Sequence, residues 1–209
     1  MPAGLQTHCT AFEGARRIAT GDLAEVASKS KAAVDKGRQV LIFDDASSEP
    51  IEVDFRGTVE DVLHRLAERD RKESAAVATE MPRGPGRPKL GVVAREVTLL
   101  PRHWDWLNAQ PGGASVALRK LVETARRANE GKDRVRQSQE AAYRFMSAMA
   151  GNRPGFEEAT RALFAAHRER FEQSIKSWPQ DIRNHASKLA TVALENAAVD
   201  DHGPRTGGS

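Results

Sequence analysis

Cysteines, long apolar runs and a cationic leader are scarce or missing in this chain of 209 residues. The single cysteine, Cys9, has no second thiol with which to form an internal disulfide, so nothing indicates an oxidising compartment. No apolar run approaches the length that is needed to cross a bilayer. Residues 1–9 do not combine a basic start with an apolar stretch, which argues against a signal peptide. We therefore expect a cytoplasmic protein.

The sequence also lacks the motifs of catalysis. It has no phosphate-binding loop, no nucleophile elbow and no histidine pair at metal-site spacing. Asp44 and Asp45 could form an acid or metal pair, but adjacent carboxylates are more typical of a turn. His8 and Cys9 have no second ligand pair at the required spacing. We predict a protein that is not an enzyme and that holds no metal or cofactor.

Charge is distributed unevenly around a formal net charge of +3. Residues 1–80 hold 11 Lys/Arg against 15 Asp/Glu, whereas residues 81–131 hold 9 against 4. Residues 132–209 are nearly balanced, with 12 against 10. The middle of the chain is therefore the part that we expect to meet a polyanion.

Residues 81–90, which we call the basic arm, read M-P-R-G-P-G-R-P-K-L. Proline donates no backbone hydrogen bond and glycine loses much entropy in regular structure, so the arm is predicted to be extended. Its Gly86-Arg87-Pro88 core resembles an AT-hook. The resemblance implies that Arg83, Arg87 and Lys89 approach the minor groove of A·T-rich DNA. The alternative is a flexible basic linker.

Residues 1–72 are predicted to form a small α+β domain. Apolar residues at 51, 53 and 55 alternate with charged ones, which is the period of a half-buried strand. Asp22 with Glu25, and Thr58 with Asp61, have the spacing of a helix capping box. The expected elements are strands at 9–12, 16–19, 40–43 and 51–55 and helices that begin at Asp22 and Thr58. A linker is expected at 73–90.

The order of elements in residues 91–131 resembles the ribbon-helix-helix family of DNA-binding proteins. A strand is predicted at 92–100, and Pro101 suits the first turn of a short helix. The break at 111–113 precedes a second helix, which Ser115 is predicted to cap and Gly131 to end. The alternative is a plain helical hairpin with an edge strand.

The ribbon-helix-helix resemblance implies a dimer whose paired strands enter the major groove of double-stranded DNA. It also implies that backbone amides at Gly113, Ala114 and Ser115 bind a phosphate. The strand register stays open: if Val97 and Leu99 face the core, Thr98 and Glu96 face the bases, and if Leu100 does, Arg95 faces them. The predicted DNA-binding residues are Arg83, Arg87, Lys89, Arg95, Thr98, Gly113, Ser115, Arg119 and Lys120, with Arg126 and Arg127 as further backbone contacts.

Residues 132–199 are predicted to form a helical module, with breaks at Gly151, Pro154 and Pro179. Its Met and aromatic stripes are typical of core packing, and His167 and His185 are interpreted as surface or core residues. Residues 200–209 are polar and Gly-rich and are expected to be disordered.

Two runs, 87–107 and 143–151, resemble a bacterial domain-of-unknown-function family (DUF2239-like). The resemblance implies bacterial relatives of similar length and carries over no catalytic residue. Together, these patterns favour a dimeric cytoplasmic protein that binds A·T-rich DNA, as a transcriptional regulator or a nucleoid-associated protein. The alternative is a protein-interaction adaptor that uses its helical C-terminal half. The flanking modules are expected to serve oligomerisation or ligand sensing, and the sequence does not identify a small-molecule effector.

Overall fold

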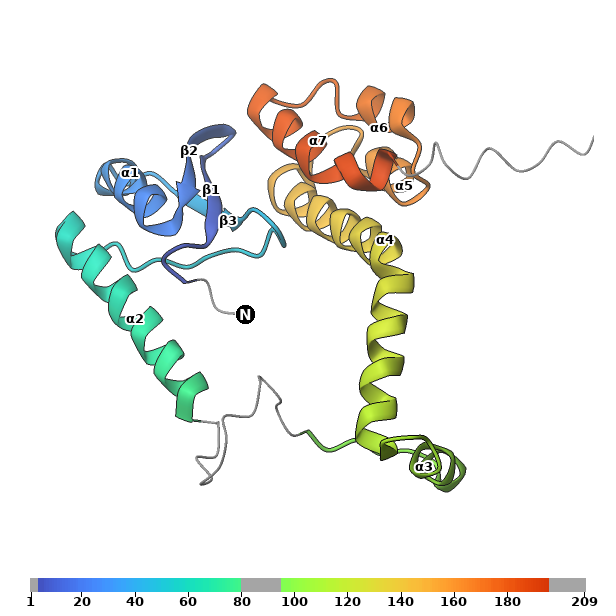
Figure 1. Ribbon diagram of the computed structural model, residues 1–209. Helices are drawn as coiled ribbons and strands as arrows, with labels where there is room; N and C mark the ends of the chain where they lie inside the picture. Colours follow the sequence, from blue (N-terminus) through green and yellow to red (C-terminus); the bar gives the residue numbers. More distant parts are fainter. Residues whose placement is uncertain (1–3, 80–94, 196–209) are drawn as a thin grey trace, which may run out of the picture. The chain divides into compact units, whose positions relative to one another are not determined.

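The computed structural model describes residues 4–79 and 95–195, and the chain divides into two compact units (Figure 1). Unit 1 comprises residues 1–75 and 134–209, and unit 2 comprises residues 76–133. Unit 1 is therefore discontinuous in the sequence. Among the described helices, none has both the length and the apolar character that a membrane span requires.

The sheet of unit 1 has three antiparallel strands in the order β2-β1-β3. β1 (His8–Glu13) and β2 (Arg16–Asp22) form the predicted hairpin. Gly14 lies in its turn at a φ of +56°, a conformation that glycine adopts without a steric penalty. β3 (Val40–Asp44) pairs with the other edge of β1. The predicted strands at 9–12, 16–19 and 40–43 are confirmed.

The first helix, α1 (Leu23–Asp35), begins where the sequence predicts, but its expected capping box does not form. The Asp22 side chain makes no capping hydrogen bond, and the Glu25 carboxylate lies 2.6 Å from Lys29 Nζ instead. A Glu–Lys pair four residues apart on a helix is itself favourable, so it competes with the cap for the carboxylate. The apolar residues that α1 buries are Leu23, Val26 and Ala27.

The second helix, α2 (Val59–Thr79), starts with the other predicted capping box. The Thr58 amide donates to Asp61 Oδ2 at 2.8 Å, and the Asp61 amide donates to Thr58 Oγ1 at 3.2 Å. The hydrogen bonds from Thr58 hold the pKa of the Asp61 carboxyl below its usual value. The helix continues into the range that we expected to be a linker.

The segment at 51–55 does not form the predicted strand. The predicted burial alternation is present, because the apolar residues are partly buried and their charged neighbours are exposed. The backbone, however, bonds to side chains of α2: Arg65 Nη2 donates to the carbonyl oxygens of Asp54, at 2.8 Å, and of Arg56. A guanidinium group offers several donors in a fixed fork, so it can satisfy carbonyl groups that a neighbouring strand would otherwise bond.

A single helix of 38 residues, α4 (Gly113–Ala150), follows the short α3 (Pro101–Asn108). Pro101 occupies the first turn of α3, as predicted. The prediction that a helix ends at Gly131 was wrong, because α4 continues through that residue. A glycine inside a helix costs only about 1 kcal/mol relative to alanine, and the strong helix formers around it outweigh that cost.

The C-terminal helices are α5 (Phe156–Phe164), α6 (Arg168–Ser174) and α7 (Gln180–Glu195). The predicted breaks are confirmed, since α4 stops before Gly151 and α7 starts after Pro179. Gly155 precedes α5 with a φ of +84°, and a Cβ atom there would lie 2.3 Å from the Ser174 carbonyl oxygen. Only glycine fits this close approach between α5 and the end of α6.

The two faces of the sheet pack into two different cores. Cys9 and Ala11 face α1 and α2, whereas Phe12 and Phe43 join the larger core formed with α4, α5, α6 and α7 (Figure 1). The ring of Phe145 lies 5.3 Å from the ring of Phe12 and 5.3 Å from that of Phe43, measured between centroids. Residues from the two ends of the described chain therefore share one hydrophobic core.

Candidate nucleic-acid interface

The two adjacent carboxylates of unit 1 have structural partners. Asp44 Oδ1 accepts the backbone N–H groups of Ala46 at 2.9 Å and Ser47 at 2.7 Å, so Asp44 is a turn former. Asp45 accepts the Thr10 hydroxyl at 2.6 Å and lies 3.1 Å from Lys188 Nζ, which ties the end of β3 to α7. Burial disfavours the charge of Asp45, but these hydrogen bonds outweigh burial and hold the pKa of its carboxyl below the usual value.

His8 and Cys9 do not form a ligand pair. Cys9 is fully buried, and burial, together with the nearby Asp45 and Asp44 charges, raises the pKa of its thiol to about 12. A thiol with that pKa stays protonated at neutral pH and is a poor nucleophile. His8 Nε2 lies 3.4 Å from Asp22 Oδ1 at the surface. The described residues contain no group of three or more side chains that could hold a metal ion.

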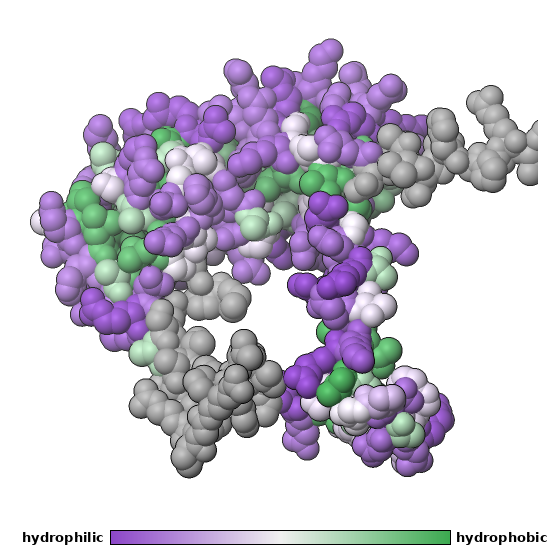
Figure 2. Space-filling model, viewed as in Figure 1, coloured by the Kyte–Doolittle hydropathy of each residue, from purple (hydrophilic) through white to green (hydrophobic). Residues whose placement is uncertain are grey.

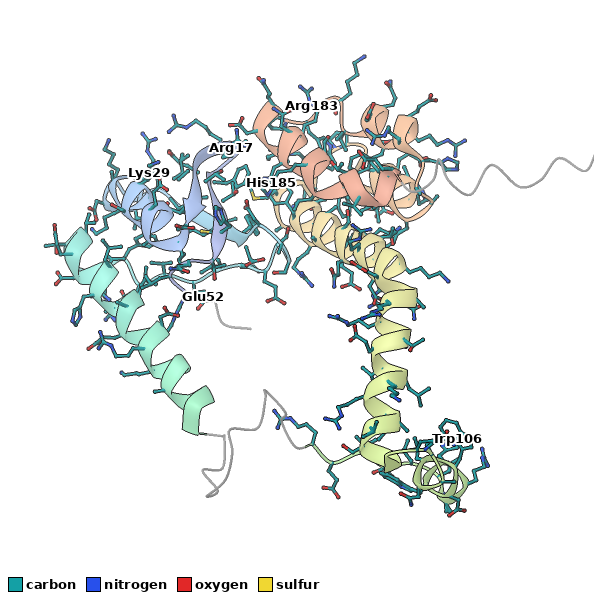
Figure 3. The ribbon with its side chains drawn as sticks, in the orientation of Figure 1. Arg17, Lys29, Glu52, Trp106, Arg183 and His185 are labelled. Atoms are coloured by element: carbon teal, nitrogen blue, oxygen red, sulfur yellow. The ribbon has the colours of Figure 1, made fainter. Side chains whose placement is uncertain are left out.

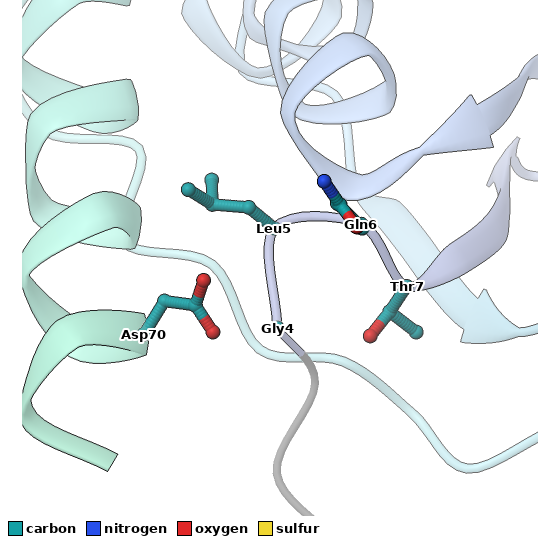
Figure 4. Close-up of a pocket in the computed structure, with 5 residues that line it drawn as sticks. All are labelled: Gly4, Leu5, Gln6, Thr7 and Asp70. Atoms are coloured by element: carbon teal, nitrogen blue, oxygen red, sulfur yellow. The ribbon is translucent and has the colours of Figure 1, made fainter. Parts of the chain in front are cut away.

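A shallow hollow of about 360 Å³ lies between the start of the described chain and α2 (Figure 4). One ionisable side chain, Asp70, stands at its edge, and the other lining residues are Gly4, Leu5, Gln6 and Thr7. A lone carboxylate beside neutral residues offers no acid–base pair and no nucleophile with its base. The hollow therefore does not supply a catalytic constellation.

Segment 95–100 follows the end of α2 as the next described part of unit 2, and it has no regular secondary structure. Arg95 and Thr98, which were predicted to face bases, are both exposed, and so is Glu96. Leu99 is the least exposed residue of the segment. A strand needs a neighbouring strand for its backbone hydrogen bonds. Residues 95–100 of the predicted strand therefore have no strand partner within the described chain, and neither of the two registers is selected.

The start of α4 differs in detail from the prediction. The helix begins at Gly113, two residues before Ser115, so Ser115 lies in the first turn and is not the cap. The Gly113 amide donates to the Gln110 carbonyl at 2.9 Å and is already used by the turn. The amides of Ala114 and Ser115 lie in the first helical turn, where backbone N–H groups have no intrahelical acceptor. Of the three amides that the resemblance assigns to a phosphate, those of Ala114 and Ser115 therefore have no acceptor within the helix.

Basic side chains follow within the next turns of α4. Arg119 and Lys120 are exposed and pair with no carboxylate in the described part of the chain; Arg119 Nε donates to the Ser115 carbonyl at 3.1 Å. Arg126 and Arg127 instead share Glu123 Oε1, at 3.2 and 3.0 Å. Arg119 and Lys120 are therefore two adjacent exposed cations near the start of α4 that no carboxylate of the described residues neutralises.

The predicted arm residues Arg83, Arg87 and Lys89 lie outside the described residues. The sequence shows how much of the charge they carry. Residues 95–133 hold seven Lys/Arg against five Asp/Glu, whereas residues 81–94 hold three Lys/Arg and no Asp/Glu. Most of the positive excess in the middle of the chain therefore belongs to the arm.

Comparison of the sequence with known protein families identifies one bacterial family. The model of family DUF2239, described as "Uncharacterized protein conserved in bacteria", matches residues 8–190. The chain belongs to this family. The match includes both runs, 87–107 and 143–151, in which the sequence resembles the family. No curated protein and no solved structure matches the chain.

Unit 2 of this DUF2239 protein exposes apolar side chains that the sequence pattern assigns to a core. Leu107 and Ala117 are the buried hydrophobic residues within 95–133, and neither belongs to the cores of unit 1. The exposed ones lie on segment 95–100, on α3 and on α4, and Figure 3 shows Trp106 on α3. They are Val97 at 51%, Leu100 at 48%, Trp106 at 52%, Leu121 at 48% and Val122 at 63% exposure, and we call them the apolar face.

His185 is a buried titratable group in the larger core of unit 1. It is 1% exposed, and its ring lies 4.5 Å from that of Phe145 and 5.4 Å from that of Phe12, between centroids. Neither imidazole nitrogen has a hydrogen-bond partner among the described residues. Burial, opposed only in part by the Asp45 charge, lowers the pKa of His185 to about 4. The imidazole is therefore a neutral member of the core, as the sequence interpretation allowed.

Stability should fall in mild acid because of this histidine. The folded-state pKa of His185 is about 4 against an ordinary value of 6.5, so between these values the unfolded chain binds more protons. Acidification from pH 6.5 to 4 should lower the free energy of unfolding by about 3 kcal/mol through this group. Urea denaturation at several pH values measures the effect. His185→Phe should flatten the profile over this range, whereas His167→Ala, at an exposed site, should leave it unchanged.

Proposed function

We propose that this chain is a bacterial DNA-binding protein, a transcriptional regulator or a nucleoid-associated protein, that binds A·T-rich duplex as a dimer through residues 81–131. The observation that carries the proposal is the start of α4. There, two first-turn amides precede the exposed and carboxylate-free Arg119 and Lys120. The basic arm comes shortly before this site in the sequence.

The start of α4 is suited to a phosphate. Amide groups in the first turn of a helix point along the axis, and the helix dipole favours an anion there. Arg119 and Lys120 add full charges within about one further turn. Contacts of this kind position a protein on the duplex without reading its sequence. They account for affinity, and they make binding depend on salt because counterions are released.

Sequence preference requires other groups. Under the ribbon-helix-helix hypothesis, segment 92–100 pairs with the same segment of a second chain and enters the major groove. Arg95 and Thr98 are exposed in the single chain and are free for such a role. Glu96 is exposed beside them, and its charge repels phosphates. We therefore assign the preference for A·T-rich DNA to the arm, because a narrow minor groove attracts arginine.

Removing the two α4 cations should reduce the salt dependence of DNA binding. Each phosphate contact contributes about 0.9 to the slope of log K against log salt, so Arg119→Ala/Lys120→Ala should lower it by about 1.8 per protomer. Gel shifts over a salt series measure the slope. The control is Lys36→Ala/Lys176→Ala, which removes two exposed lysines of unit 1. An equal loss of slope in both variants would contradict the assignment.

Arg87→Ala should reduce the preference for A·T-rich over G·C-rich duplex by roughly 10-fold, since one well-placed contact discriminates by about 1–3 kcal/mol. Competition between the two duplexes at one salt concentration measures the ratio. If affinity for both falls equally, Arg87 contacts phosphates and not the minor groove.

One observation favours the adaptor as a second candidate. Tyr143 on α4 and Phe164 on α5 are 43% and 51% exposed, with ring centroids 5.9 Å apart. An exposed aromatic pair of this kind is typical of a protein contact. Deletion of residues 81–131 separates the two functions, because an adaptor keeps its partner and a DNA-binding protein loses its ligand.

A further inference from the structure

The middle of α4 is exposed on every side. Each of residues 124–132 is exposed, and a run of that length covers all directions around a helix axis. Figure 2 shows mainly hydrophilic surface along this part of the helix. Most helices in proteins are stabilised by packing an apolar face against a neighbour, and a short helix is marginal in water without such packing. Residues 124–132, which we call the exposed stretch, are therefore helical with little support from packing.

The parts of α4 on either side of the exposed stretch are anchored. On the C-terminal side, Phe145 is fully buried in the larger core of unit 1. The Ser138 hydroxyl donates to the Leu189 carbonyl oxygen at 2.6 Å, which ties α4 to α7. On the N-terminal side, Ala117 is a buried residue of unit 2. The boundary between the two units follows Asp133, directly after the exposed stretch.

Two residues near the end of the exposed stretch are poor helix formers. Asn129 Nδ2 donates to the Ala125 carbonyl oxygen at 2.8 Å, and a side chain that bonds to nearby backbone competes with the helical hydrogen bonds. Gly131 follows two residues later, and a glycine inside a helix disfavours the helical state by about fivefold relative to alanine. The ion pairs that Glu123 forms are local to this helix and stabilise it only weakly.

Gly131 uses none of the properties that only glycine has. Its backbone is helical, and a Cβ atom there would meet no atom of the described residues within 4 Å. Gly155 is the opposite case, because its φ is +84° and a Cβ atom would lie 2.3 Å from the Ser174 carbonyl oxygen. An alanine at position 131 would therefore fit the folded chain and strengthen the helix. Packing does not require the weak point at Gly131.

We infer that Gly131 is the centre of a hinge in α4, at which the helix bends or locally unwinds while the parts on either side stay folded. Glycine adopts a wider range of φ and ψ than any other residue, and a hinge is a short run of residues that absorbs such a change. The hinge lets the start of α4, with Arg119 and Lys120, change direction without opening the core around Phe145. It is a property of the single chain and goes beyond the proposed function.

Distances between two spin labels on α4 test the hinge in the full chain. Cys9 is the only cysteine, so Thr124→Cys/Ser147→Cys in a Cys9→Ala background places one label on each side of Gly131, at exposed sites. In a straight helix the two labelled Cα atoms lie about 35 Å apart, because each residue adds about 1.5 Å. Double electron–electron resonance should give a broad distribution that extends to shorter distances. Gly131→Ala should narrow it to one peak near the straight-helix value.

The matched control moves the glycine into the anchored part of the helix. Gln137 is exposed and lies beside Ser138, which bonds to α7. Gly131→Ala/Gln137→Gly therefore keeps one glycine between the labels and should keep the narrow distribution. A broad distribution in this variant would show that the exposed stretch does not locate the bend, and the inference would be wrong.

Hydrogen exchange gives a second readout that needs no engineered cysteine. Backbone amides of residues 128–135 should exchange faster than those of residues 141–150, because local opening at the hinge exposes them to water. Gly131→Ala should slow exchange in the first range by about fivefold and leave the second range unchanged.

The outcomes separate the hinge from DNA binding, because both measurements are made without nucleic acid. One narrow distance peak in the chain that keeps Gly131, or equal exchange rates in the two ranges of α4, would overturn the inference. A chain that bends at Gly131 but fails to bind DNA refutes the proposed function and leaves the hinge intact. A chain that binds DNA with a rigid α4 does the reverse.

Discussion

The packing of Phe145 against Phe12 and Phe43 is the interaction on which the rest of unit 1 depends. It joins a helix from the second half of the chain to a hairpin and a strand from the first half. Unit 1 therefore closes only after the intervening residues have been synthesised, and unit 2 is, in sequence terms, an insertion within it. A contact between residues so far apart in sequence carries a high loop-closure cost, which a large aromatic core can offset.

The insertion has the opposite physical character. Unit 1 buries Phe12, Phe43, Phe145 and Phe171, whereas unit 2 exposes tryptophan, leucine and valine side chains and carries Arg119 and Lys120 near the start of α4. A stable scaffold that carries an incompletely buried, basic segment is an arrangement suited to binding a large polyanion. This contrast between the units agrees with the proposal that unit 2 binds a polyanion, which the start of α4 carries.

Local patterns predicted most of the elements of unit 1. The hairpin around Gly14, the α2 cap at Thr58 and the breaks at Gly151 and Pro179 depend on neighbours in sequence, and all are confirmed. Two of the failures depend on distant or competing partners. The 51–55 segment bonds to Arg65, and Glu25 bonds to Lys29. The shared core of Phe12 and Phe145 has no local signal at all.

The candidate interface was predictable in its position but not in its exposure. Charge and composition locate the basic middle of the chain, and helix signals locate α3 and the start of α4. The exposed state of Leu121 and Val122 was not predictable, because an apolar stripe indicates burial without saying which chain provides the cover. The hydrogen bond from the Gly113 amide to the Gln110 carbonyl was not predictable either, because it depends on turn geometry that residue types do not specify.

The solitary, fully buried thiol of Cys9 has a practical consequence. Because burial keeps this thiol protonated, it reacts with alkylating reagents only when β1 separates from α1 and the side chain reaches solvent. The rate of alkylation thus reports how often this sheet opens, without any engineered label. Each alkylated chain gains one mass increment. Intact-mass spectrometry of the wild-type protein could therefore measure how fast the sheet opens as ligands or solvent are changed.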